Sequence, residues 1–339
     1  MSVPTIAFFN NKSGVGKTSL VYHLAWMYAE LGIRVLAADL DPQANLTAMF
    51  LDDDALAELW PEGEHPLTIA GGVSEIRRGI GDVKPPPLRP IDDAERLALV
   101  PGDLALSQFE DSLSEVWPKA ADGDERAFRV LSAFWRIMQD SAAAHNAGLV
   151  LIDLGPNVGA INRAALISAD FIVVPLSPDL FSLQGLRNLG PSLRMWRQQW
   201  AERKGKNPVS SLSLPPGTMK PIGYVVQQHS VRLDRPVQAY DKWVRRIPGA
   251  YAKYVLGQGG NEVEGESDGS RLAMLKNYRS LVPMAQEARK PMFDLKPADG
   301  AQGSHLSAAR EVGKDFRRLA EAIVEKAGLE LALPSPAPS

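Results

Sequence analysis

Apolar and polar residues repeat in a regular order over the first 180 positions. A short apolar run at 5–10 ends in a turn, and residues 18–31 then place apolar side chains at helical spacing. Gly32 is typical of a helix C-terminus, and another apolar run follows at 34–41. Because apolar strands alternate with helices, the pattern predicts an α/β fold in which helices cover both faces of a mostly parallel, twisted sheet.

Further elements extend this Rossmann-like arrangement. We expect strands at 96–102, 148–156, 170–178 and 221–228, and helices near 103–116, 124–146, 162–169 and 180–203. Pro191 should kink or split the last of these helices. The C-terminal part adds a short helix, a short strand and a long amphipathic helix, at 281–290, 291–295 and 304–327.

Several segments interrupt the pattern. Residues 52–95 are rich in acidic residues and prolines and keep only a weak helical signal near 73–79, so we expect a surface insertion. Residues 204–220 are rich in proline, serine and glycine, and residues 257–270 are rich in glycine and acidic residues, so we expect flexible loops at both. The remaining sequence predicts a single domain over residues 1–330 and a disordered tail at 331–339.

Composition narrows the functional classes. The 339 residues carry a net charge of -3, so attraction to nucleic acid or anionic lipid requires a local patch. The absence of cysteine excludes disulfides, thiolate metal sites and iron–sulfur clusters. The chain shows neither a secretory leader nor an apolar run long enough to span a bilayer, and the sequence after Gly328 is not a basic amphipathic helix. We therefore expect a cytoplasmic protein that does not bind membranes.

Residues 10–19 read NNKSGVGKTS and lie between the first strand and the first helix. The phosphate-loop template G-x-x-x-x-G-K-[ST] is matched at Gly16, Lys17 and Thr18, but Asn11 stands where the first glycine belongs. Small residues let backbone N–H groups surround phosphate oxygens, and the helix N-terminus adds partial positive charge. This interpretation places Lys17 at the β- and γ-phosphates and Thr18 at a magnesium ion. The competing explanation is a glycine turn beside a surface lysine.

Three acidic residues follow apolar strands. Asp39 and Asp41 close the second strand two positions apart, so alternation along the strand places both on one face. Asp153 ends LVLID, the pattern of a buried strand that delivers one carboxylate to a magnesium ion. A solvated strand end would explain each acid alone. Three such acids beside one phosphate loop favour a nucleotide site at the carboxyl edge of the sheet.

These motifs resemble the ParA/MinD/Soj group of deviant Walker ATPases, which belong to the SIMIBI class of P-loop NTPases. The resemblance lies in KSGVGKT, ADLDPQANLT, LALVPGDLALSQFE and LVLIDLGPNVGAINRAALISADFIVVPLSPDLFSLQGL, covers about residues 3–190, and resumes at LVPMAQEARKPMFDL and the last helix. The loop of that group reads K-G-G-V-G-K-T and has no glycine at the position of Asn11. The mismatch with the general template is therefore normal for this group.

The resemblance implies a slow, magnesium-dependent ATPase that dimerises on binding ATP and that an adaptor protein of the ParB kind activates. Lys12 matches the signature lysine that crosses the dimer interface to the partner's nucleotide, and Asp41 matches the acid that positions the attacking water. Asp153 matches the Walker B acid, and Asp39 lies near the magnesium shell with Thr18. The implied nucleotide-binding residues are Ser13, Gly14, Val15, Gly16, Lys17, Thr18, Ser19 and Gln227. For Gln227, which would read the adenine, an ordinary surface glutamine is the competing explanation.

The position of Lys12 gives a physical reason for a dimer. It lies five residues before Lys17 on a tight loop, so it is geometrically awkward for both lysines of one chain to reach one phosphate. A lysine supplied by a second chain adds positive charge at the transferred phosphoryl group. Two residues depart from the group's pattern: Ser13 replaces its first loop glycine, and Gly155 replaces the first proline of D-x-P-P. We expect nucleotide binding to persist and the loop after Asp153 to be more flexible.

Two basic segments are candidates for the non-specific DNA binding that the resemblance implies. Residues 225–257 contain six basic and two acidic residues with aromatic residues between them, and Arg245 and Arg246 are the proposed contacts. The last helix offers Arg317 and Arg318. A solvated basic face explains either segment about equally well.

The leading hypothesis is an ATP-switched dimer that positions or partitions a plasmid, a chromosomal region or another cargo in the cytoplasm, on the nucleoid if it binds DNA. One alternative is a regulatory or assembly module that uses ATP as a structural switch without partitioning DNA. The other is a P-loop biosynthetic ligase, which would form a product besides ADP and phosphate.

Overall fold

The protein forms one eight-stranded sheet in a computed structural model that describes residues 2–227, 237–258, 269–278 and 280–331. The strands lie in the order β3-β4-β2-β5-β1-β6-β7-β8, and every neighbouring pair is parallel except the β3–β4 hairpin. This order confirms the predicted α/β fold. The strands are β1 Thr5–Phe8, β2 Val35–Asp39, β3 Arg89–Ile91, β4 Ala94–Val100, β5 Leu149–Asp153, β6 Phe171–Leu176, β7 Lys220–Gln227 and β8 Arg271–Leu275.

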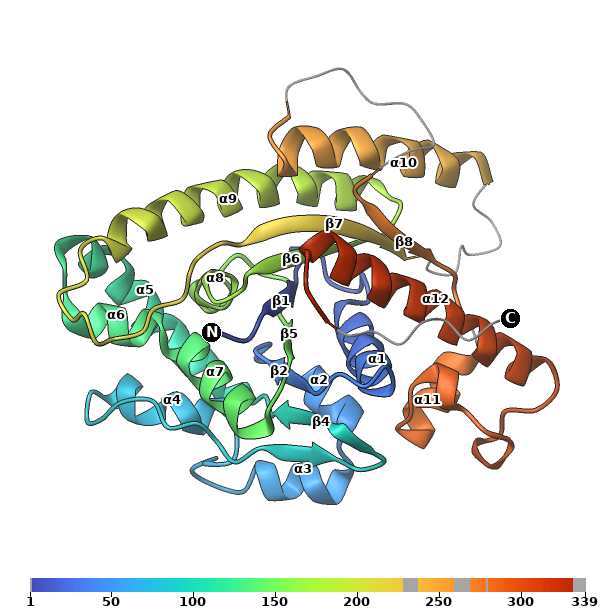
Figure 1. The fold of residues 1–339 in the computed structure, drawn as a ribbon, viewed down its shortest axis with the longest axis horizontal. Helices are drawn as coiled ribbons and strands as arrows, with labels where there is room; N and C mark the ends of the chain where they lie inside the picture. Colours follow the sequence, from blue (N-terminus) through green and yellow to red (C-terminus); the bar gives the residue numbers. More distant parts are fainter. Residues whose placement is uncertain (1, 228–236, 259–268, 279, 332–339) are drawn as a thin grey trace.

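Helices cover both faces of the sheet (Figure 1). Alternate residues of the central strands point to opposite faces, so Ala7 and Phe9 join one apolar core while Ile6 and Phe8 join the other. The first core packs against α4 Ile69–Arg78, α5 Phe109–Lys119, α6 Glu125–Leu131, α7 Ala133–His145, α8 Ala160–Ile167 and α9 Leu180–Lys204. The second packs against α1 Lys17–Glu30, α2 Asn45–Phe50, α3 Asp53–Leu59, α11 Leu281–Ala288 and α12 Ser304–Ala327.

The predicted α12 is confirmed, whereas three other expectations need correction. Pro191 does not split α9, because buried residues on both sides, such as Leu189 and Leu193, hold the helix against the core. The helix expected over 124–146 is two helices that meet at Ser132. Residues 291–295 were expected to form a strand but contain a 3₁₀ turn at Met292–Asp294, because so short an apolar run does not distinguish the two. The eighth strand, β8, was not predicted.

The segment 52–95 contains more regular secondary structure than the sequence predicted. It contains α3, α4 and β3, and the side chains of Ile69, Val73 and Ile76 are buried in the core. Acidic and proline residues between short elements obscured their periodicity, so the sequence predicted only part of α4. The prediction of an irregular excursion is therefore wrong for its central part.

A buried carboxylate fixes this segment to the end of β4. Asp103, which is 1% exposed at its side chain, accepts hydrogen bonds from the Thr68 hydroxyl at 2.7 Å and the Ala105 amide at 2.8 Å. His65 Nδ1 lies 2.7 Å from the same carboxylate. A single acid thus joins the start of α4 to the loop after β4.

Residues 205–219 lack helix and strand, as predicted, but they are anchored. The indole of Trp200 donates to the Pro215 carbonyl at 3.0 Å, and Arg197 donates to the Thr218 carbonyl at 2.8 Å. Most of the other predicted loop, 257–270, and of the tail at 331–339 lies outside the described residues, and their flexibility stays a prediction. Within the described part of the chain, none of the helices combines the length and apolar character that a bilayer crossing requires.

α1 packs against α12 through a buried histidine. The ring of His23 stacks on Phe316 with centroids 5.0 Å apart, and its Nδ1 donates to the Ser19 carbonyl at 2.7 Å. Burial lowers the pKa of His23 to about 4, so the imidazole is neutral at physiological pH.

We predict that Asp103→Ala lowers the free energy of unfolding by about 2 kcal/mol or more, because buried donors lose their acceptor. Urea unfolding monitored by circular dichroism measures the loss. Asp140→Ala, at an exposed site on α7, is the matched control and should change stability by less than about 0.5 kcal/mol. Equal stability of Asp103→Ala and the control would contradict the anchoring role.

The neutral state of His23 predicts a loss of stability in acid. The unfolded chain binds a proton near pH 6.5 and the folded chain only near pH 4, so stability falls as pH drops through this window. Between pH 7.5 and pH 5 this group contributes a loss of about 2 kcal/mol. His23→Gln should show a correspondingly smaller decrease than the wild type when urea unfolding is compared at the two pH values. Parallel decreases in both proteins would refute the assignment.

Candidate functional site

Three parallel strands end side by side at the candidate site. In the register of the sheet, Asp153 at the end of β5 lies opposite Phe8 of β1 on one side and Asp39 of β2 on the other. The loop after β1 is the predicted phosphate loop, and Asp41 follows β2. The carboxyl edge of the sheet therefore brings together the four motifs that the sequence singled out.

The loop between β1 and α1 has the backbone of an anion-binding turn. Gly14 and Gly16 adopt φ values of +69° and +76°, which favour glycine, and α1 begins directly afterwards at Lys17. Ser13 does not adopt a positive φ, so a glycine is not needed at this departure from the family pattern. At the start of the loop, Asn10 donates to the Pro175 carbonyl at 2.7 Å and accepts from the Lys12 amide at 3.1 Å.

Lys17 is nearly buried at the start of α1. Its side chain donates to the Lys12 carbonyl at 3.3 Å, and the residue is only 7% exposed. Burial lowers the pKa of Lys17, while the negative charges of Asp153 and Asp41 act in the opposite direction. A bound phosphate would supply the anion that this ammonium lacks.

Asp153 is fully buried, and neither carboxylate oxygen has a hydrogen-bond partner. Burial raises the pKa of Asp153 well above its usual range and the neighbouring Asp39 raises it further, whereas the nearby Thr18 hydroxyl and the Lys17 ammonium lower it. An unpartnered buried carboxylate is costly unless a cation or donor compensates it. The arrangement therefore fits a magnesium ion at Asp153. The Thr18 hydroxyl, in the first turn of α1, is the second group that would hold this ion.

Asp39 occupies a different environment from Asp153. Its carboxylate accepts hydrogen bonds from the Thr47 amide and hydroxyl, both at 2.8 Å, and from the Asp41 amide at 3.3 Å. Burial raises the pKa of Asp39 to about 7, against the effect of these donors. Since Thr47 also accepts from the Gly102 amide at 2.7 Å, Asp39 fixes the ends of β2 and β4. The donors already engage both of its oxygens, which favours a positioning role over direct metal ligation.

Asp41 packs against the loop that follows β5. One carboxylate oxygen accepts from the Gln43 amide at 3.0 Å, and a Cβ at Gly155 would lie 3.0 Å from that oxygen. Glycine in place of the family's proline thus leaves room for the carboxylate. The end of the same loop is held by Asn162, which donates to the Gly155 carbonyl at 2.8 Å.

A carboxylate from a distant helix fixes the start of α8. Glu110 on α5 accepts from the amides of Ala160 and Ile161 at 2.6 and 2.8 Å. The loop between Asp153 and α8 is therefore held at its far end. No local sequence pattern predicts this contact, because the partners lie 50 residues apart and are adjacent only in the folded chain.

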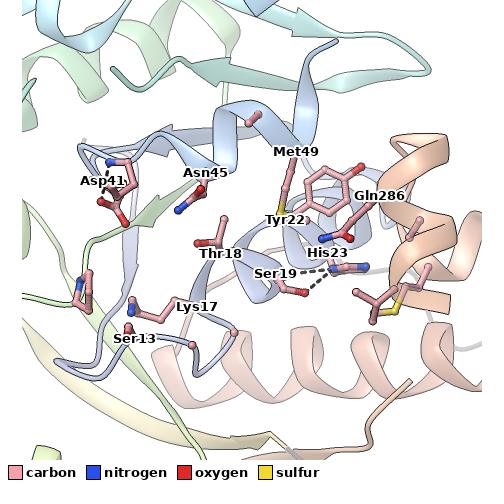
Figure 2. A pocket seen from close by; sticks show the side chains of 18 residues that line it. Ser13, Lys17, Thr18, Ser19, Tyr22, His23, Asp41, Asn45, Met49 and Gln286 are labelled. Carbon is pink, nitrogen blue, oxygen red and sulfur yellow. Dashed lines mark hydrogen bonds between the residues drawn. The ribbon is translucent and has the colours of Figure 1, made fainter. Parts of the chain in front are cut away.

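The described residues enclose a cavity of about 680 Å³ beside the loop (Figure 2). Ser13, Lys17 and Asp41 lie at its polar end, whereas Tyr22, Met49 and Gln286 line the opposite end. The second group comes from α1, α2 and α11, and the sequence analysis assigned it no binding role, although Gln286 lies in the motif LVPMAQEARKPMFDL. Polar groups at one end and apolar walls at the other suit an amphipathic ligand such as a nucleotide. Val15 is fully buried, and Gly14, Gly16, Thr18 and Ser19 also line the cavity.

Of the predicted nucleotide-site residues, Lys12, Val15, Asp39, Asp153 and Gln227 do not line this cavity. Gln227, at the end of β7, donates to the Gly16 carbonyl at 3.1 Å and supports the loop from the side of β7. Lys12 forms an ion pair with Asp179, the N-cap of α9, and both side chains are about one quarter exposed. Asp179 is a contact that the sequence analysis did not identify.

The proposed DNA-binding arginines occupy two separate surfaces. Arg245 and Arg246 are exposed on α10 Val237–Ala250, where Arg246 lies 5.6 Å from the ring of Trp243. Lys242 and Lys253 of the same segment are also exposed, whereas Arg232 and Arg235 lie outside the described residues. On α12, Arg318 is exposed, whereas Arg317 forms an ion pair with Glu321 at 3.0 Å.

Among the described residues, no group of three or more histidine, aspartate or glutamate side chains is arranged to hold a metal ion.

Comparisons with known proteins agree with this geometry. A protein-family model described as an AAA domain matches residues 3–204. The virulence plasmid ParA family protein of Chlamydia psittaci is 28% identical over 191 residues, which cover 55% of this chain and 61% of that protein. This chain spans about half the length of the curated relatives that it matches.

Solved structures share the fold. Protein DIP2308 of Corynebacterium diphtheriae is 20% identical, with a TM-score of 0.70 over 96% of this chain and 99% of its own. A putative plasmid partition protein of Borrelia burgdorferi, solved with AMPPNP bound, is 16% identical, with a TM-score of 0.56 over 96% of this chain and 99% of its own. From the phosphate loop, the strand order and the matched family model, we conclude that the chain belongs to the ParA-like P-loop NTPases of the SIMIBI class.

Proposed function

We propose that the protein is a magnesium-dependent ATPase whose ATP-bound form is a dimer. The observation that supports this most directly is the unpartnered, buried carboxylate of Asp153 beside the near-buried ammonium of Lys17. In the protein alone, the two charges act on each other, and the only hydrogen bond of the Lys17 ammonium among the described residues is to the Lys12 carbonyl. A magnesium nucleotide would supply a cation for the first and phosphate oxygens for the second.

The residues of the site then have distinct roles. Thr18 and Asp153 would hold the magnesium ion, which when bound neutralises charge on the phosphates. Lys17 and the amides of the loop 13–19 bind phosphate oxygens. Asp39 positions Thr47 and the end of β2, and through them Asp41. This assignment departs from the sequence prediction, which placed Asp39 among the metal ligands.

Asp41 is the proposed positioning residue for the attacking water. Its carboxylate lies beside Gly155, where it would accept a hydrogen bond from a water aligned with the terminal phosphate. Hydrolysis needs little covalent chemistry from the protein, so alignment and charge stabilisation account for the rate.

The opposite end of the cavity suits the base of the nucleotide. Tyr22, Val282 and Met49 provide apolar surface there, and the Gln286 amide offers one donor and one acceptor group. The prediction that Gln227 reads adenine stays open, because its amide contacts Gly16 instead of lining this end.

Dimer formation would have to break the ion pair between Lys12 and Asp179. Asp179 holds the Lys12 side chain within its own chain, so Lys12 must leave this contact to reach a partner's nucleotide. A partner's phosphates, carrying more charge than one carboxylate, favour that exchange. ATP-dependent dimers would then bind DNA without sequence preference, and an adaptor protein of the ParB kind would stimulate turnover. We infer that the output is the positioning or partition of a plasmid or another cargo in the cytoplasm, on the nucleoid when bound to DNA.

We predict that Asp41→Ala and the wild type reach twice the monomer mass with ATP and Mg²⁺, but not with ADP. Lys12→Ala should bind ATP and stay monomeric, whereas Lys17→Ala should lose nucleotide affinity at least about 10-fold, because a lost charge-assisted contact costs about 1.4 kcal/mol or more. Size-exclusion chromatography with light scattering and nucleotide titration give both readouts. Lys326→Ala, an exposed lysine on α12, is the matched control. A monomeric Asp41→Ala protein with ATP would contradict the dimer.

We predict that Arg245→Glu/Arg246→Glu weakens DNA binding while leaving ATP-dependent dimers intact. The slope of log K against log salt should fall by roughly 2 per protomer, because two phosphate contacts are lost. The matched variant Arg317→Glu/Arg318→Glu tests the α12 surface by the same DNA titration. Unchanged, salt-dependent affinity in the first variant would remove α10 from the DNA-binding surface.

The two alternative functions predict different turnover. ATPase assays with and without duplex DNA distinguish them when reaction products are identified at the same time. Tight ATP binding with negligible hydrolysis and no DNA retention would indicate an assembly module. A product beyond ADP and phosphate would indicate a ligase.

A further inference from the structure

A pocket on the α4 and α5 side of the sheet is separate from the nucleotide cavity. We call it the α4 pocket. It has a volume of about 390 Å³ and lies between α4, the loop before it, residues 84–87 and the chain that leads into α5. Among the described residues, none lines both this pocket and the nucleotide cavity. Ligand pockets measure roughly 300–1,000 Å³, so this volume suits a small molecule of one or two rings.

Two adjacent glycines of α4 let neighbouring segments approach the helix closely. A Cβ at Gly71 would lie 2.3 Å from the His65 carbonyl oxygen, and a Cβ at Gly72 would lie 3.1 Å from the Lys84 carbonyl oxygen. The Lys84 amide also donates to the Gly72 carbonyl at 2.9 Å. Each glycine inside a helix costs about 1 kcal/mol relative to alanine, and here the close approach of two walls explains both. The shape of the α4 pocket is therefore set by the sequence of α4.

The floor of the α4 pocket is apolar. Val73 and Phe109 line it and are each only 1% exposed. Leu67, Pro85 and Pro87 extend this surface toward solvent. An apolar group that displaces poorly ordered water from such a surface gains affinity.

The unpaired charge in the lining of the α4 pocket is mainly positive. Arg77 and Lys84 line the pocket, and neither forms an ion pair in the described part of the chain. Of the two acids in the lining, Glu64 pairs with Arg78 at 3.3 Å, which among the described residues leaves Glu75 unpaired. Two unpaired cations against one unpaired acid favour an anionic ligand.

A chain of hydrogen bonds joins one wall of the α4 pocket to the nucleotide site. His65 lines the pocket, and its Nδ1 lies 2.7 Å from the Asp103 carboxylate. The preceding residue, Gly102, donates its amide to the Thr47 hydroxyl at 2.7 Å, and that hydroxyl donates to the Asp39 carboxylate at 2.8 Å. The wall at His65 and the buried acid of β2 therefore belong to one network.

The other wall of the α4 pocket leads to the loop after Asp153. Phe109 lines the pocket, and the next residue, Glu110, accepts hydrogen bonds from two amides at the start of α8 at 2.6 and 2.8 Å. A ligand between His65 and Phe109 therefore contacts the segments that hold both acid-bearing loops. Such contiguous contacts are a physical route by which one site can influence the other.

We propose that the α4 pocket is an effector site for a small amphipathic anion, which has an aromatic or branched apolar body and one carboxylate, sulfonate or phosphate group. The body packs on Val73 and Phe109, and the anionic group meets Arg77 and Lys84, where the Ser74 hydroxyl adds a donor. Occupancy of the pocket changes nucleotide affinity through its two walls. Binding of the anion is independent of the proposed function, whereas its effect on the nucleotide rests on that function.

The test titrates the full chain with anilinonaphthalene sulfonate, whose rings fluoresce more strongly in an apolar site. We expect one-to-one saturation, and phenylnaphthylamine, the same ring system without the sulfonate, should bind at least about 10-fold more weakly. Arg77→Glu/Lys84→Glu should weaken binding of the sulfonate at least about 10-fold, and Ser74→Trp, which fills the pocket, should weaken it by a similar factor. Absence of saturation, or equal affinity for the two probes, would overturn the proposal.

The matched control is Arg310→Glu/Lys326→Glu, which makes the same change in net charge at exposed sites on α12. It should alter probe affinity by less than about 2-fold at about 0.15 M salt, because distant charges are screened. Equal weakening by this control would show attraction to net charge and would overturn a defined pocket. Displacement of the probe by ATP, together with unchanged affinity in Arg77→Glu/Lys84→Glu, would place the probe in the nucleotide cavity and would also overturn it. Thermal unfolding checks that each variant is folded.

The effect on the nucleotide is measured by titrating ATP with and without saturating anilinonaphthalene sulfonate. The dissociation constant of ATP should change at least about 5-fold, and ATP should change the affinity of the probe by the same factor, because coupling between two sites is reciprocal. Saturable probe binding with unchanged ATP affinity would overturn the effector role. Probe binding by a protein that binds no ATP would contradict the proposed function and the effector role, and would support the anion site alone.

Discussion

The carboxylate of Asp153 is the constraint on which the arrangement of the site depends. Burying this carboxylate without a hydrogen-bond partner destabilises the ligand-free protein. The neighbouring residues compensate its negative charge only in part. Lys17 lies close enough to influence it but is itself desolvated, and Asp39 adds negative charge. A ligand that brings a cation and several anionic oxygens relieves all three groups together. This is the physical reason to read the site as one for a magnesium nucleotide.

Two aspartates of similar sequence context therefore take different roles. Asp39 and Asp153 lie opposite each other in neighbouring strands and are both fully buried. Donors from Thr47 and the Asp41 amide satisfy Asp39, whereas Asp153 has none. Strand pattern alone cannot separate them, because the difference arises from the loop that follows β2. A metal-binding role for both was a reasonable expectation, and the contacts favour only Asp153.

The elements predicted most accurately from the sequence are those in which the pattern of apolar residues runs without interruption. The apolar strands β1, β2 and β5 and the amphipathic α12 each show one period over their whole length, and the phosphate loop lies where its template requires. The segment 52–95 was obscured because its helices are short and separated by prolines. Two contacts could not be predicted in this way: Glu110 with α8, and Lys12 with Asp179. They join residues far apart in the chain, so no local sequence pattern predicts them.

Helices α2 and α11 form the wall of the nucleotide cavity at the end away from Lys17. Ala48 and Met49 of α2 and Ala285 and Gln286 of α11 line it. Arg289, which follows α11, donates to the Leu51 carbonyl at 3.2 Å, so the ends of both helices are joined. Thr47, also in α2, donates through its hydroxyl to the Asp39 carboxylate at 2.8 Å. Because one short helix contacts the buried acids on one side and α11 on the other, the polar and apolar ends of the cavity are held in a fixed relation to each other.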